Sequence, residues 1–156
     1  MTIDPTSHLT ARFVNALQMV TQLVPYVDDH QLPLVVRLAC IEAWYMNYRL
    51  LLEFFFHKPQ KNCAGVESFL TSWKPSSPCP DDLGRDYGMT SADFAHIGNT
   101  RNRQTPATVS SSDLRPKAEV FLAVAEEFSL VLSAEDHDMA DLIRIGVESA
   151  RTSLSS

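Results

Sequence analysis

The sequence predicts an all-α protein, an antiparallel bundle of about five helices. Three observations lead to this prediction. Apolar residues recur every three to four positions in several long segments, as on one face of a helix. Residues that cap helices stand at the start of those segments. No segment alternates apolar and polar residues with comparable regularity, as a half-buried strand would.

Length and composition predict one domain. The chain has 156 residues, enough to bury a single core, and we assign residues 1–156 to one domain. Hydrophobic residues make up 45% and charged residues 21% of the chain. These values are typical of globular proteins and argue against disorder.

The first two helices are predicted at about residues 6–24 and 33–57. Pro25 should kink or end the first helix, because proline lacks the backbone N–H that the next turn needs. Pro33 suits the first turn of the second helix, where that N–H has no partner anyway, and Pro59 stops this helix. The second segment is apolar nearly all round, so we expect a central helix that is packed on several sides.

Residues 58–89 are expected to form a long irregular loop between the second and third helices, because they contain four prolines and three glycines. Within the loop, residues 66–73 are compatible with a helical turn. Three further helices are predicted at about 91–103, 110–132 and 136–151, each preceded by serine, threonine or aspartate as a cap.

Neither a membrane span nor a bound metal or cofactor is expected. The chain starts without an apolar leader, and the helix with the longest apolar stretch also carries four charged residues. The three cysteines have neither disulfide nor zinc-ligand spacing, which predicts a reducing, cytoplasmic setting. His137 and Asp141 could offer metal ligands four residues apart, but acidic residues near a helix start are favoured by the helix dipole alone.

Charge is unevenly distributed along the chain. The net charge is −6, which does not favour nucleic-acid binding, yet residues 101–117 hold four basic residues and one acidic residue. Such a cluster can create a local positive potential despite the acidic total. The alternative is that these charges simply belong to solvated helix faces.

One stripe of the second helix carries Glu42, Arg49, Glu53 and His57, separated by seven, four and four residues. Arg49 and Glu53 can therefore form an ion pair along the helix. In a central helix these charges would be at least partly buried, and buried charges are tolerated only when they are paired and hydrogen-bonded.

A second polar stripe is predicted on the helix at 91–103, where His96, Asn99 and Arg103 share one face. If this helix approached the second helix in antiparallel fashion, His96 would lie near Arg49 or Glu53. The spacing alone does not fix the register between the two helices.

Two strings carry a resemblance to a known family: Tyr48-Arg49-Leu50-Leu51-Leu52-Glu53-Phe54-Phe55, and about forty residues later Ala95-His96-Ile97-Gly98-Asn99-Thr100-Arg101. Together they resemble the HEPN superfamily, and within it the AbiU2-like abortive-infection group, over roughly residues 35–132. The resemblance implies a helical bundle, often a homodimer, and in active members metal-independent RNA cleavage in defence or toxin biology.

By this resemblance the candidate catalytic residues are Arg49, His96 and Arg101. Histidine can act as general acid or base at the ribose hydroxyl or the leaving oxygen, and arginine can stabilise phosphate charge. The supporting candidates are Glu53, Glu42, Asn99 and Arg103.

A second interpretation is a non-catalytic interaction module. In it, the Arg49–Glu53 pair fixes helix packing, and the Phe54-Phe55-Phe56 end of the helix dimerises or binds a protein partner. The RNA and interaction hypotheses remain open at the level of sequence.

Overall fold

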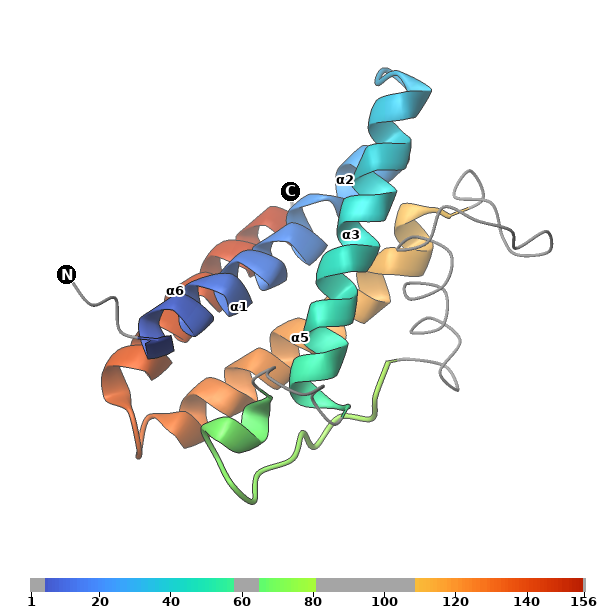
Figure 1. Ribbon diagram of the computed structural model, residues 1–156. Helices are drawn as coiled ribbons and strands as arrows, with labels where there is room; N and C mark the ends of the chain where they lie inside the picture. Colours follow the sequence, from blue (N-terminus) through green and yellow to red (C-terminus); the bar gives the residue numbers. More distant parts are fainter. Residues whose placement is uncertain (1–4, 58–64, 81–108, 156) are drawn as a thin grey trace.

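The computed structural model describes residues 5–57, 65–80 and 109–155 (Figure 1). Within these ranges the elements are α1 (Pro5–Gln22), α2 (Val24–Val27), α3 (Leu34–Phe55), the 3-10 turn η1 (Val66–Ser68), α5 (Ser111–Leu132) and α6 (His137–Ser155). The described ranges contain no strand, and the predicted all-α fold is confirmed. The helix predicted at 91–103 lies outside the described residues.

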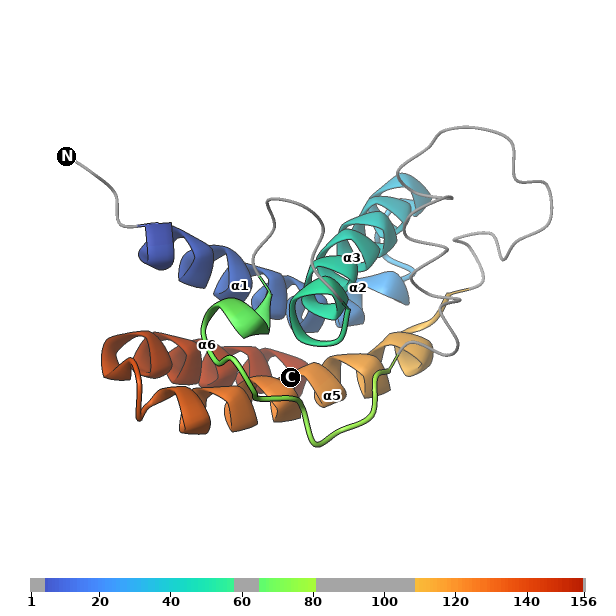
Figure 2. The ribbon, with the colours of Figure 1, turned by 60° about the horizontal axis from the view of Figure 1, so that its bottom comes forward.

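The helices are arranged around one core. α5 and α6 form an antiparallel hairpin, and α1 lies beside α6 and runs in the same direction (Figures 1 and 2). α3 crosses α1 and α5 at a steep angle, and its N-terminal end extends beyond the other helices in both views. The buried residues of α3 accordingly lie between Ile41 and Phe55, not in its first two turns.

The predicted interruption at Pro25 is confirmed. α1 ends at Gln22, and the chain restarts as the four-residue α2, with Pro25 in its first turn. The indole Nε1–H of the fully buried Trp44 donates a 2.7 Å hydrogen bond to the carbonyl oxygen of Val20. This bond attaches α3 to the last turns of α1.

Two carboxylates organise the start of α5. Asp113 accepts hydrogen bonds from the backbone N–H and the hydroxyl of Ser110, at 2.9 and 2.7 Å. Asp28, at the end of α2, accepts the backbone N–H of Ser111 at 2.8 Å. The predicted start of this helix near residue 110 is confirmed, and the negative charges lie where the helix dipole favours them.

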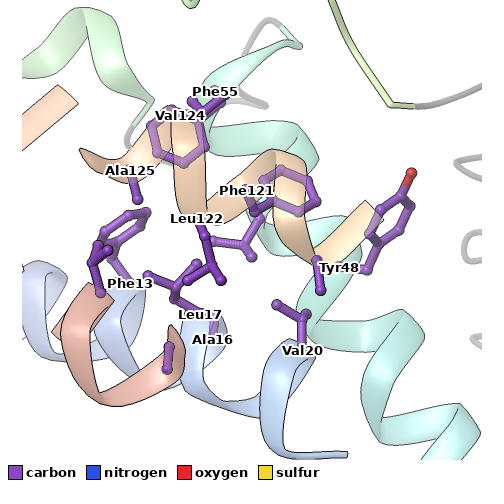
Figure 3. Packing of buried hydrophobic residues seen from close by; sticks show 14 of the residues in the cluster. Phe13, Ala16, Leu17, Val20, Tyr48, Phe55, Phe121, Leu122, Val124 and Ala125 are labelled. Atoms are coloured by element: carbon purple, nitrogen blue, oxygen red, sulfur yellow. The ribbon is translucent and has the colours of Figure 1, made fainter. Parts of the chain in front are cut away.

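The core is rich in aromatic side chains from α1, α3 and α5 (Figure 3). The ring of Phe55 lies 5.4 Å from that of Phe13 and 6.4 Å from that of Phe121, between centroids. Phe54 and Phe56 are half-buried and pack against the same core. The three consecutive phenylalanines therefore anchor the end of α3 inside the protein.

The expectation that α3 is packed on several sides along its length is wrong. One side of it is exposed, and Val35 keeps 71% of its surface accessible. The other exposed large apolar side chains of α3 are Leu34, Val36, Met46 and Leu50. The first turn of α3 extends beyond the other described helices. Met46 and Leu50 lie on the opposite side of the helix from the buried Trp44 and Tyr48.

Substituting Gly146 by alanine should destabilise the fold. An added Cβ at this position in α6 would lie 2.7 Å from Cγ1 of Val14 in α1. Alanine favours the helix by about 1 kcal/mol, but overpacking costs about 1–3 kcal/mol, so we expect a net loss of about 1 kcal/mol in the free energy of unfolding, measured by urea denaturation.

The double variant Gly146→Ala with Val14→Ala provides the control. Because Val14→Ala removes the colliding methyl groups, the double variant should be more stable than the sum of the two single effects predicts. Strictly additive effects would show that the close contact does not limit this position.

The stability of the protein should depend on Asp113 at acid pH. The two hydrogen bonds from Ser110 lower the pKa of the Asp113 carboxyl below its ordinary value of 3.8. The contribution of a carboxylate with a lowered pKa is fully present above the unfolded-state pKa and is lost as the pH falls through the folded-state pKa. In Asp113→Asn, the melting temperature should therefore fall less steeply between about pH 5 and pH 2 than in the wild type.

Asp138→Asn is the matched control for that experiment, because Asp138 is also an acidic residue in the first turn of a helix, α6. If this variant flattened the pH profile as much as Asp113→Asn does, the effect would belong to first-turn charge in general and not to the Ser110 hydrogen bonds.

Candidate functional site

The predicted ion pair of α3 is present. Nε of Arg49 lies 2.9 Å from Oε1 of Glu53, four residues further along the helix. The side chains are 22% and 15% exposed, respectively. The pair is thus mostly buried, at the edge of the bundle. A buried charge is tolerated only when it is paired, so each of the two side chains depends on the other.

Packing of the neighbouring residue fixes the position of Arg49. Tyr48 is completely buried, and its ring stacks on that of Trp44, with 4.7 Å between centroids. The ring of Phe121, from α5, meets the Tyr48 ring edge-on at 5.4 Å. Because Tyr48 points into the core and Leu50 is exposed, Arg49 lies at the border between the packed and the open side of α3.

A cation–π contact joins α5 to α3. Nζ of Lys117, from α5, is 5.5 Å from the centroid of the Tyr48 ring, within the range of a cation–π contact. Lys117 belongs to the base-rich stretch at 101–117, which the sequence analysis singled out by composition only. Its proximity to α3 depends on how α5 packs, so sequence spacing could not reveal it.

The base-rich stretch does not form one continuous surface in its described part. Arg115 donates a hydrogen bond through Nη1 to the carbonyl oxygen of Leu154 in α6. Two residues later, Lys117 faces Tyr48 of α3 instead. Successive residues of a helix point in different directions, and here that separates the two positive charges.

The predicted burial of Glu42 is wrong, because its side chain is exposed to solvent. Glu42 shares a stripe with Arg49, but it lies two turns nearer the end of α3 that the bundle does not cover. His57 follows the C-terminal end of α3 and is half-buried. A single helical stripe therefore passes through different environments as α3 crosses the bundle.

Four of the candidate residues lie outside the described residues: His96, Asn99, Arg101 and Arg103. The approach of His96 to Arg49 or Glu53 thus remains a prediction. The described part of the candidate site consists of the Arg49–Glu53 pair.

Metal-ligating side chains are not grouped in the described ranges, where no cluster of three or more histidines, cysteines or acidic residues could hold an ion. Nε2 of His137 lies 3.6 Å from Oδ2 of Asp141, and Asp141 also contacts Arg144 at 3.3 Å. Both residues of the His137–Asp141 pair thus belong to the charged surface of α6. Among the described helices, none combines the length and the apolar character that crossing a membrane requires.

We compared the chain with known proteins in three ways. It matches no protein-family model, no curated protein and no solved structure.

Proposed function

We propose that the chain is a HEPN-like helical domain that binds RNA and cleaves it without a metal ion, in a defence or toxin system. The observation that carries this proposal is the Arg49–Glu53 pair at the edge of the bundle. A guanidinium has five N–H donors in a rigid plane. A carboxylate that holds Nε fixes that plane in advance, and a fixed plane is what recognition of a phosphate group requires.

The remaining chemistry is assigned by resemblance to that family. His96 transfers the proton at the ribose hydroxyl or at the leaving oxygen. Arg101 acts with Arg49 on the phosphate charge that grows in the transition state. Asn99, Arg103 and Glu42 support these groups, and the cleft would form between two copies of the chain.

Replacing His96 by alanine should abolish RNA cleavage. Loss of a general acid–base group lowers the rate by about 10²–10⁴-fold, whereas the melting temperature should change little if the residue serves chemistry and not packing. The measurement is cleavage of assorted RNAs by purified wild type and variant, with oligomeric state and melting temperature recorded. RNAs left intact by the wild type would contradict the proposal.

A matched pair of arginine variants tests Arg49 in the same assay. Arg144 in α6 also pairs with a glutamate four residues later, at 3.2 Å from Glu148, but it is well exposed. Arg49→Ala should reduce cleavage strongly and Arg144→Ala should not. Equal cleavage by the two variants would exclude Arg49 from the site.

The second candidate function is a non-catalytic interaction module. The exposed apolar side of α3 favours it, since exposed apolar residues that share a helix face often mark protein-binding sites. The phenylalanine end of α3 is packed on the core, so in this proposal the contact surface is the exposed side of α3 around Met46 and Leu50. The Arg49–Glu53 pair would then fix packing only.

Under this second proposal, Leu50→Glu should weaken self-association. A buried charge without a partner is strongly unfavourable in an interface, so we expect dimers of the wild type to dissociate about tenfold or more readily in the variant. Sedimentation velocity over a concentration series measures this change.

Leu130→Glu is the control, because Leu130 lies on α5 and is similarly exposed. A wild-type protein that is monomeric at all concentrations, or equal effects of the two glutamates, would argue against the exposed side of α3 as a self-association surface.

A further inference from the structure

The exposed side of α3 carries a stripe of apolar residues with the spacing at which two helices pair. We call it the α3 stripe, and it consists of Ala39, Ala43, Met46 and Leu50, separated by four, three and four residues. This spacing returns to the same side of a helix and lets two helices pack along each other. Ala43 is half-buried and the other three residues are exposed. The stripe points away from the core, because the buried Tyr48 lies on the opposite side of α3.

The sizes of these side chains favour an antiparallel partner, and the partner of matching shape is a second copy of the chain. With a twofold axis midway between Ala43 and Met46, residues at equal distances on either side of the axis face each other. Ala39 then faces the partner's Leu50, and Ala43 faces the partner's Met46. Each large side chain fills the space beside a small one, as close packing requires. In a parallel pair each residue would face its own copy, and the alanine layers would leave gaps.

The charges beside the α3 stripe favour the same arrangement. Glu42, which is exposed, and Arg49 lie on the same flank of the stripe, one on each side of the twofold axis. Antiparallel pairing brings Glu42 toward the partner's Arg49, and the partner's Glu42 toward Arg49. Arg49 keeps Glu53 on Nε, and a guanidinium carries further donors on its two Nη atoms. A parallel pair would place Glu42 and the partner's Arg49 on opposite flanks, too far apart to bond.

We infer that two copies of the chain associate through antiparallel α3 helices, with the twofold axis midway between Ala43 and Met46. The inference rests on the interaction module proposed above as the second candidate function, and it adds the partner and the register. α3 is open to such a partner, since its first turn extends beyond the other described helices (Figures 1 and 2). The paired segment, residues 39–50, is about 18 Å long. Because this contact is short, the two copies should exchange readily between dimer and monomer.

Disulfide trapping tests the register. The three native cysteines are replaced by alanine, and Ala39→Cys and Leu50→Cys are made separately, one of them with an affinity tag. Their mixture should form a mixed disulfide dimer under mild oxidation, because positions 39 and 50 of the two copies face each other, and a disulfide requires Cα atoms within about 7 Å. Either variant alone should form little dimer, since two copies of the same position lie about 16 Å apart along the helix axis. Non-reducing electrophoresis measures both yields.

Charge reversal tests the pairing across the interface. Glu42→Lys should raise the dissociation constant of the dimer about three- to tenfold, because it places like charges at both symmetric contacts. Glu119→Lys makes the same change at an exposed position of α5 and should leave the constant unchanged. Equal effects of the two variants, or trapping of Leu50→Cys with itself as efficiently as with Ala39→Cys, would overturn the register while leaving self-association intact. A wild type that is monomeric in sedimentation velocity at all concentrations would overturn the interaction module together with it.

Discussion

The buried contact of Trp44 with α1 is the interaction on which the rest of the structure depends. Its indole N–H is bonded to the Val20 carbonyl oxygen, and its ring stacks on Tyr48 one turn later in α3. Tyr48 in turn meets Phe121 of α5. The hydrogen bond and the ring contacts together connect α1, α3 and α5. An indole N–H that is buried without an acceptor would destabilise the fold, which makes the bond to Val20 necessary. The rotation of α3 about its own axis is therefore fixed by this contact.

That rotation decides what each remaining residue of α3 can do. With Tyr48 in the core, the next residue, Arg49, lies at the border of the bundle, and Glu53 follows it one turn later. Leu50 is left in solvent. At the end of the helix, Phe55 enters the core while the residues beside it border a cavity. The single orientation of α3 thus decides the positions of the ion pair, the exposed apolar side chains and the residues that border the cavity.

The two functions proposed for α3 depend on different side chains at the border between its packed and its open side. RNA binding relies on a guanidinium held in a fixed plane by a carboxylate. Protein contact relies on apolar side chains that the bundle leaves uncovered. The two features occupy neighbouring positions of α3 and can be altered one at a time.

Sequence alone determined the helical class, the break at Pro25, the start of α5 and the Arg49–Glu53 pair, because each depends on residues within a few positions of one another. It also gave His96 and Arg101 as candidates by resemblance, and these lie outside the described residues. Only the tertiary structure decided that Glu42 is exposed, that Lys117 faces Tyr48 and that Trp73 packs on Phe128 of α5. These outcomes depend on the crossing of helices that are far apart in the chain, and local spacing carries no information about crossing angles.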